Sequence, residues 1–335
     1  MRDITVAFPL ERDIEAWERA HAQGIVPSRW PYGLDELAAS GSRRRVGLGE
    51  LARPMRAWSL VRSSIPDRST GRAVVTWDEN AAARLPATRG ISRHSGVIWL
   101  TDGAASSHDV RSRVRWLRQF ESLWVLSSAQ IAPLRDLVGR HGPRISSVAF
   151  GVDHEFFGLR SYPSRPLVLS VGGDRDRDVV TLYRAMADVK RSLPHAEIVV
   201  QTSSSLEPPE GIARVARVSH LELRELYARA SVVTIATRPN LHVSGMTVSL
   251  EAMATGRPVV ITGTPGMRDY VQQGVNGLIV SPGDADALAR QTVALLRDES
   301  RGRELGMAGR VSVVASRTTA DLCAGIRRAV DGPVE

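Results

Sequence analysis

The chain has 335 residues, a formal net charge of +8, one cysteine and an apolar fraction of 43%. At roughly 150 residues per domain, this length predicts two domains that each bury their own core, and the composition excludes a disordered or collagen-like chain. The lone Cys323 excludes a disulfide scaffold and a cysteine-based zinc cluster. No stretch reaches the roughly 18 apolar residues of a membrane helix, and the first residues do not predict a signal peptide. We therefore expect a soluble, cytoplasmic protein whose contact with a membrane is at most peripheral.

The excess positive charge consists almost entirely of arginine, because Lys190 is the only lysine. It is spread over both halves of the chain, and the only basic block is the arginine run at 43–45. Nucleic-acid-binding proteins usually concentrate their charge in a patch or stripe. The charge therefore favours an arginine-rich composition or an anionic small substrate over a nucleic-acid partner.

The N-terminal half predicts strands joined by irregular connections. Apolar runs predict these strands at 4–9, 72–77, 96–100 and 122–127. Segments 10–32 and 50–70 have weak periodicity and mixed proline, glycine and arginine content, which predicts long loops or short helices. Pro163 and Pro166 interrupt a stretch without periodicity, and we place the domain boundary near residue 157.

The C-terminal half alternates buried strands with helices. The strands are predicted at 166–173, 196–200, 231–237 and 257–262, and the helices between them at about 178–192, 221–230 and 247–255. Continuous Val and Ile runs separated by helices predict a doubly wound α/β domain with a parallel sheet that is covered on both faces. In such domains the ligand binds at the carboxyl ends of the strands.

The strongest motif is SGMTVSLEAMATGRPVV at 244–260. Ser244 and Gly245 precede a helix that is predicted to start near Thr247, and a helix N-terminus with a glycine before it is suited to binding phosphate. Glu251 lies four residues after Thr247 on the same helix face, where its carboxylate can accept hydrogen bonds from ribose hydroxyls. The alternative is a capped helix with a solvated glutamate.

A second motif, VGGDRDRD at 171–178, directly follows a buried strand. Its glycine pair at 172–173 permits a tight turn, and Arg175 and Arg177 can reach a diphosphate. The D-x-D at 174–176 can instead hold a divalent metal. The remaining alternative is a solvated turn with local ion pairs of little energetic value.

These motifs occur in an order that resembles the donor-binding domain of family 4 glycosyltransferases, which have the GT-B fold. The resemblance covers 166–310 through VLSVGGDRDRD, EIVV, LELRELYARASVV, SGMTVSLEAMATGRPVV and GTPGMRDYVQQGVNGLIVSPGDADALA. It is weaker at SLWVLSSAQIAPL and SSVAFGVDHEFF in the N-terminal half. It implies two Rossmann-like parallel-sheet domains facing a central cleft: an acceptor-binding domain at 1–157, a donor-binding domain at 158–312, and a helix at 313–335 that crosses back to the first domain.

The resemblance also implies roles for single residues. Glu251 stands where the closing glutamate of an E-x7-E motif binds the donor ribose, but Val243 replaces the opening glutamate, which contacts the sugar. His242 and Ser244 flank this position and can supply part of that contact, or the donor is a sugar with fewer hydroxyls, such as a deoxysugar.

The same comparison implies where the diphosphate binds. The family's arginine and lysine positions hold Gly173 and Arg177, so we expect Arg177 to bind the diphosphate, with Arg175 supplying the missing cation. The remaining expected donor contacts lie just before the ribose glutamate, at Ser244, Gly245, Met246 and Thr247. The family generally needs no bound metal, so we expect neither a metal nor a cofactor.

The N-terminal half offers fewer candidates. Tyr32-Gly33-Leu34 is a candidate for the family's glycine-rich loop, which makes Gly33 a candidate donor contact. Asp78 and Asp102 follow predicted strands and can orient or deprotonate an acceptor hydroxyl. Capping of the following helix is the alternative for each aspartate.

The expected function is therefore a retaining transfer of a hexose or deoxyhexose from a nucleoside-diphosphate sugar to a hydroxyl of a small natural product, saccharide or envelope lipid. The alternatives are a GT-B sugar-nucleotide epimerase or hydrolase and a noncatalytic sugar-nucleotide-binding subunit.

Overall fold

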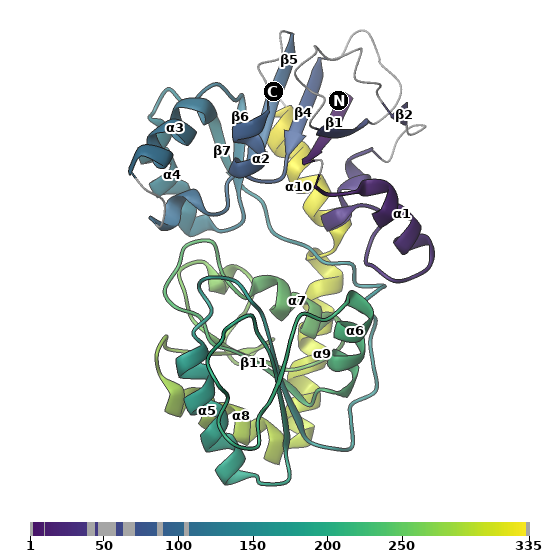
Figure 1. Ribbon diagram of the computed structural model, residues 1–335, viewed down its shortest axis with the longest axis vertical. Helices are drawn as coiled ribbons and strands as arrows, with labels where there is room; N and C mark the ends of the chain where they lie inside the picture. Colours follow the sequence, from purple (N-terminus) through teal and green to yellow (C-terminus); the bar gives the residue numbers. More distant parts are fainter. Residues whose placement is uncertain are drawn as a thin grey trace. The chain divides into compact units, whose positions relative to one another are not determined.

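The computed structural model describes residues 3–9, 11–38, 44–45, 58–62, 71–85, 90–103 and 107–332 (Figure 1). The chain divides into two compact units. Unit 1 comprises Met1–Gln23, Ser28–Ala149 and Thr319–Glu335, and unit 2 comprises Gly24–Pro27 and Phe150–Thr318. Arg43 and the parts of segment 50–70 at 50–57 and 63–70 lie outside the described residues. Within the described ranges, no helix is both long and apolar enough to cross a bilayer.

Unit 1 is built on one mixed sheet with the order β2-β3-β1-β4-β5-β6-β7. Its parallel strands are β1 (Asp3–Pro9), β4 (Arg72–Thr76), β5 (Ile91–Gly96), β6 (Ser122–Val125) and β7 (Arg144–Ser147). On the other side of β1, β3 (Trp58–Arg62) and β2 (Arg44–Arg45) pair antiparallel. The antiparallel strand β3 falls in a segment that was predicted to contain only loops or short helices.

The helical elements of unit 1 are α1 (Ile14–Ala22), η1 (Pro31–Ala38), α2 (Glu79–Arg84), η3 (Leu100–Asp102), α3 (Ser107–Leu117), η4 (Ser128–Gln130), α4 (Ile131–Val138) and α10 (Thr319–Asp331). The last helix, α10, belongs to unit 1 although it follows unit 2 in sequence, and it packs on η1, β6 and β7. The buried cluster includes Val97, Leu117, Leu123 and Leu134.

The strand predicted at 96–100 is wrong, because β5 ends at Gly96. The residues that form β5 include His94 and Ser95, which are fully buried yet polar. Ser122 Oγ lies 2.7 Å from His94 Nδ1, and Thr76 Oγ1 donates a hydrogen bond to Ser95 Oγ at 2.8 Å. Hydrogen bonds between neighbouring strands thus replace the apolar packing on which the prediction depended.

Unit 2 contains a parallel sheet with the order β10-β9-β8-β11-β12-β13. Its strands are β8 (Leu167–Val171), β9 (Glu197–Gln201), β10 (Ala213–Val215), β11 (Val232–Ile235), β12 (Val259–Thr262) and β13 (Leu278–Val280). Every residue of β8, β11 and β12 is buried. This burial is expected of parallel strands with both faces covered, and it confirms the predicted parallel sheet.

The helices of unit 2 are α5 (Val179–Ser192), α6 (His220–Arg229), α7 (Met246–Ala254), α8 (Ala285–Arg297) and α9 (Glu299–Ser316), with the short η5 at Met267–Asp269. Helices α5 and α8 pack against one another, and α7 packs against α9 (Figure 1). Asp178 caps α5, and Ser219 forms a capping box with Glu222 at the start of α6, so local sequence fixes both starts.

The chain passes from unit 1 to unit 2 between Ala149 and Phe150, a few residues before the predicted boundary at 157. The Phe150 N–H donates to Tyr270 Oη at 3.0 Å, and Val152 forms a bridge with Thr318. These contacts fix the stretch after residue 149 to unit 2, although it lacks the periodicity of a helix or strand.

Candidate functional site

The strand order of unit 2 places two loops together at one edge of the sheet. From β8 the chain passes through α5 to β9 on one side, and later returns through α6 to β11 on the other side of β8. Ligands of open α/β sheets bind at this point of reversal, outside the carboxyl ends of the strands. The loops that follow β8 and β11, at 172–178 and 236–245, therefore form the candidate site.

The side chain of Arg177 lies between two glycines in these loops. A Cβ atom added to Gly172 would lie 2.3 Å from Arg177 Nε, and one added to Gly245 would lie 3.1 Å from Nη1. Gly245 is the N-cap of α7, with φ of 95°. The guanidinium thus reaches the N-terminus of α7, and both glycines are required to leave it space.

Two nitrogens of this guanidinium are buried donors that form no hydrogen bond with any residue described by the structure. Arg177 Nε and Nη1 are inaccessible to solvent, and neither has a hydrogen-bond partner among the described residues. Burial lowers the pKa of Arg177, while the charges of Asp174 and Glu251 act in the opposite direction. Buried donors without partners are costly, and buried charges are usually paired. This arrangement is suited to an anionic ligand at the N-terminus of α7.

Glu251 lies further along α7 and is buried, with 9% of its surface exposed. Tyr227 Oη donates a hydrogen bond to Glu251 Oε2 at 2.9 Å. Burial raises the pKa of Glu251 to about 7, although the hydrogen bond from Tyr227 and the charge of Arg177 both lower it. The alternative of a solvated helix glutamate is therefore wrong for this position.

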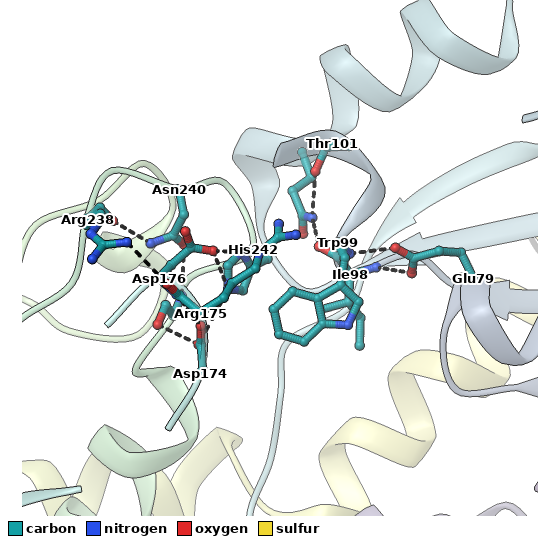
Figure 2. Close-up of polar contacts among 12 residues, drawn as sticks. Glu79, Ile98, Trp99, Thr101, Asp174, Arg175, Asp176, Arg238, Asn240 and His242 are labelled. Carbon is teal, nitrogen blue, oxygen red and sulfur yellow. Dashed lines mark hydrogen bonds and ion pairs between the residues drawn. The ribbon is translucent and has the colours of Figure 1, made fainter. Parts of the chain in front are cut away.

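Asp174 fastens the loop before α7 to the turn after β8 (Figure 2). Its Oδ2 accepts a hydrogen bond from Ser244 Oγ at 2.6 Å and lies 3.6 Å from His242 Nε2, while its Oδ1 accepts the Asp176 N–H at 2.7 Å. Burial alone would raise the pKa of Asp174, but these hydrogen bonds and the charge of Arg177 hold it well below its usual range. The first aspartate of the D-x-D thus orients the loop.

Val243 occupies a strained conformation inside this loop. Its φ is 58°, which is rare for a β-branched residue, and its side chain is buried. The Met246 N–H donates to the Val243 carbonyl at 3.1 Å, and the Ser244 N–H donates to Asn240 Oδ1 at 2.9 Å. Strain of this kind persists only where the surroundings fix it, and it is concentrated at functional sites. The sequence identified Val243 as a departure from the family, but gave no indication of this backbone conformation.

The D-x-D aspartates and His242 also form a possible metal-ligand set. One ligand atom from each of Asp174, Asp176 and His242 lies within 4.8 Å of the others. The contacts of Asp174 with Ser244 and the Asp176 backbone already use both of its oxygens. The expectation that no metal is needed stays a prediction.

The other predicted donor residues surround this loop. Arg175 is exposed, and its Nε donates to Asp176 Oδ2 at 3.0 Å, so a local ion pair holds it in this structure. The carbonyl of Gly173 accepts a hydrogen bond from Ser203 Oγ at 3.2 Å. Met246 is buried and Thr247 is half-buried in the first turn of α7.

The predicted residues of unit 1 have structural contacts of their own. Asp78 is the N-cap of α2 and accepts hydrogen bonds from the N–H groups of Asn80 and Ala81, as its capping alternative proposed. Asp102 is half-buried at the end of η3. A Cβ atom on Gly33 would lie 2.4 Å from Thr319 Cβ, so the packing of α10 accounts for this glycine. Roles for these residues with a ligand remain predictions.

Sequence reasoning missed Glu79, which shapes the loop after β5 (Figure 2). Its fully buried carboxylate accepts hydrogen bonds from the Ile98 N–H at 2.8 Å and the Trp99 N–H at 2.7 Å. Burial raises its pKa, whereas these hydrogen bonds lower it. Gln130 Nε2 fastens the same loop through the Ile98 carbonyl and Thr101 Oγ1, both at 2.9 Å. One sequence signal could have identified Glu79: it is an acidic residue directly after Asp78, the predicted helix cap.

The family comparison covers the part of the chain that carries this site. Residues 165–298 match the family model described as glycosyl transferases group 1. The predicted family resemblance is confirmed. We call this segment the group 1 domain; it contains β8 to β13 and both loops of the candidate site.

A curated relative and two solved structures extend the comparison beyond the group 1 domain. Over 46% of this chain, the sequence is 30% identical to a D-inositol 3-phosphate glycosyltransferase of Mycolicibacterium paratuberculosis, and the match covers 40% of that relative. The chain thus spans less than half the length of this relative.

The solved structures similar to this chain include a sucrose-phosphate synthase from Thermosynechococcus elongatus, with a TM-score of 0.64 and 20% identity over 77% of this chain and 73% of that one. HepE from Anabaena, solved with UDP and glucose, gives a TM-score of 0.65 and 15% identity over 78% of each chain. At this identity the likeness shows the fold, and the predicted GT-B fold class is confirmed.

Proposed function

We propose that the protein is a retaining glycosyltransferase that moves a sugar from a nucleoside-diphosphate sugar to a hydroxyl acceptor. The observation that carries this proposal is the pair of buried Arg177 atoms, Nε and Nη1, which lie at the N-terminus of α7 and have no hydrogen-bond partner among the described residues. A diphosphate supplies the acceptor oxygens and the negative charge that this position lacks. The match of the group 1 domain to a glycosyltransferase family supports the same activity.

In this proposal, Arg177 and the first N–H groups of α7 stabilise the departing nucleoside diphosphate. Negative charge grows on the diphosphate as its bond to the sugar breaks, and preorganised donors lower the barrier most when they face that charge. Gly172 and Gly245 confine the guanidinium at the N-terminus of α7. Because Nε and Nη1 are inaccessible to solvent in this structure, the site loops must open to admit the diphosphate. Arg175 provides a second cation after it separates from Asp176.

Glu251 binds the ribose in this proposal. Its carboxylate lies further along α7 than the diphosphate site, and a carboxylate can accept hydrogen bonds from the two adjacent ribose hydroxyls. His242 and Ser244 border the place where the sugar would lie, and Val243 presents no polar group there. Asp78 or Asp102 orients the acceptor hydroxyl, and the transfer needs no metal.

Donor binding tests this assignment. Calorimetric titration with UDP-glucose, GDP-glucose and ADP-glucose should identify one tight ligand; UDP is the first choice, since the similar HepE was solved with it. Glu251→Ala and Arg177→Met should each weaken binding about 100-fold, because each removes charge-assisted hydrogen bonds. The matched control Glu304→Ala changes an exposed carboxylate of α9 and should bind as the wild type does. Failure of all three nucleotides to bind the wild type would contradict the proposal.

Turnover separates this function from its alternatives. With a bound donor, sugar transfer should require an added acceptor, should continue in excess EDTA, and should give a product with the anomeric configuration of the donor. Release of free sugar as the sole product would indicate a hydrolase, and binding without turnover would indicate a noncatalytic subunit. Strict dependence on a divalent metal would instead favour a metal at Asp174, Asp176 and His242.

A further inference from the structure

Tyr227 is a buried tyrosine that enters the candidate site from outside the two site loops. It lies on α6, and its side chain is fully buried. Its ring packs edge-to-face with Phe157, with centroids 5.9 Å apart and an interplanar angle of 82°. Arg257 Nε donates to the Tyr227 carbonyl at 2.9 Å. Ring and backbone are therefore both fixed, and the position of the hydroxyl is fixed with them.

This hydroxyl acts on one oxygen of Glu251 only. Tyr227 Oη donates to Glu251 Oε2 at 2.9 Å. Burial and the neighbouring carboxylate raise the pKa of Tyr227 well above its usual value, so the hydroxyl remains a donor. Among the described residues, Glu251 Oε1 has no hydrogen-bond partner. The carboxylate is thus held at one oxygen and available at the other.

We propose that Tyr227 is a positioning residue of the donor site, which orients the Glu251 carboxylate so that its second oxygen accepts from a ribose hydroxyl. This inference rests on the proposed function for the identity of the ligand. A carboxylate with one oxygen bound to a rigid donor retains little rotational freedom, so less entropy is lost when the ribose binds. The tyrosine would not touch the nucleotide itself.

The hydrogen bond also influences the protonation of Glu251. The charged and titratable groups that act on this carboxylate are Tyr227 from α6 and Arg177 from the loop before α5. From α9, Arg310 reaches the opposite end of α7, where its Nη1 donates to the Ala254 carbonyl. A donated hydrogen bond favours the ionised carboxylate, so its removal should raise the pKa of Glu251 above its wild-type value of about 7.

The test is the pH dependence of donor binding by Tyr227→Phe, which keeps the ring and removes the hydroxyl. A nucleoside-diphosphate sugar is the probe, because its diphosphate has no group that titrates near neutral pH. If the ionised glutamate binds the ribose, wild-type affinity should fall about tenfold from about pH 8 to about pH 6. In Tyr227→Phe the midpoint should move up by about one pH unit, and this shift alone makes affinity about fivefold weaker at about pH 7. At about pH 9, where Glu251 is ionised in both proteins, the lost orientation should still weaken binding by about two- to tenfold.

Two further variants test whether Tyr227 positions Glu251 or merely supports the fold. Tyr183→Phe removes the hydroxyl of another buried tyrosine of unit 2, on α5, and should leave the profile unchanged. Glu251→Gln has no carboxylate to titrate, so the pH dependence of binding should be absent in this background with and without Tyr227→Phe. A wild-type midpoint in Tyr227→Phe, or wild-type affinity of this variant at about pH 9, would overturn the inference.

A measurement without nucleotide distinguishes this inference from the proposed function. Carbon-13 NMR of the Glu251 carboxyl in the unliganded chain should show the same upward shift of its midpoint in Tyr227→Phe. If that shift occurs but no nucleotide sugar binds the wild type, the proposed ligand is wrong and the coupling of the two residues stands. If nucleotide binds and the midpoint does not move, the role of Tyr227 is wrong and the proposed function stands.

Discussion

Replacing Arg177 with methionine should stabilise the unliganded chain and abolish tight donor binding. Methionine retains an unbranched stem that fills the space between Gly172 and Gly245. It removes the buried Nε and Nη1 atoms, which have no partner in the described ranges of the chain. An unsatisfied buried donor costs about 1–3 kcal/mol. Allowing for imperfect repacking, we expect the free energy of unfolding to rise by about 2 kcal/mol, which corresponds to about 4–8 °C in Tm.

The assay is thermal unfolding of the full chain with and without the nucleotide sugar. Donor at about 100 times the wild-type Kd should stabilise the wild type by about 2.7 kcal/mol, and Arg177→Met, which should bind about 100-fold more weakly, by no more than about 0.4 kcal/mol. Arg191→Met is the matched control, since Arg191 is exposed on α5 and, within the part of the chain that the structure describes, pairs only with Asp188. That control should change stability by no more than about 0.5 kcal/mol and should keep the response to donor.

A fall in the Tm of unliganded Arg177→Met by several degrees would refute this reasoning. It would mean that the guanidinium stabilises the fold through contacts within the chain. A rise in Tm together with a retained response to donor would refute the prediction that Arg177 is needed for donor binding, because the diphosphate would then be bound elsewhere. The prediction holds only if Arg177→Met is more stable than the wild type and is no longer appreciably stabilised by donor. That result would indicate that Arg177 serves ligand binding at the expense of stability.

Three further changes test other parts of the structure. The pKa of Glu251 is raised from 4.5 to about 7 in the folded chain, so between these pH values the folded state binds a proton that the unfolded state does not. The free energy of unfolding should therefore fall by up to about 3 kcal/mol as pH rises through this range. Glu251→Gln should remove that fall, measured as Tm at about pH 5 and about pH 8. Glu79→Ala should lower stability by about 2–4 kcal/mol in a denaturant titration, since the Ile98 and Trp99 N–H groups lose their acceptor, and a change below about 0.5 kcal/mol would contradict the contact. Asp78→Asn should keep the cap of α2 and the stability of the wild type, whereas Asp78→Ala should lower the free energy of unfolding by about 1 kcal/mol. If Asp78→Asn is as active as the wild type, Asp78 is excluded as the base.

The strands of unit 2 could be predicted because both of their faces are buried. Strands β8, β11 and β12 consist mostly of Val, Ile and Leu, and such runs between helices indicate a covered parallel sheet. Strand β5 could not be predicted in this way, because His94 and Ser95 are buried through hydrogen bonds from neighbouring strands. Those partners lie on β4 and β6, and the local sequence of β5 contains no trace of them.

The candidate site was predictable where a motif fixed the local geometry. The helix that carries Glu251 and the glycine before it follow from the spacing within 244–260. The burial of Arg177 depends on contact with Gly245, which is 68 residues away in sequence and has no local signal. The contact of Tyr227 with Glu251 likewise depends on the packing of α6. The strained backbone of Val243 is held in place by contacts of Asn240 and Asp174 with the next residue, Ser244.

The position of α10 determines the order in which the chain can fold during synthesis. Unit 1 is incomplete until Thr319–Asp331 has been made, because Thr319 packs on Gly33 and the Cys323 thiol lies 3.2 Å from the Gly33 carbonyl. Unit 2 ends at Thr318, so all of its strands leave the ribosome before the closing helix of unit 1. The first half of the polypeptide must therefore wait, with the surface that α10 will cover still open, until the second half has emerged.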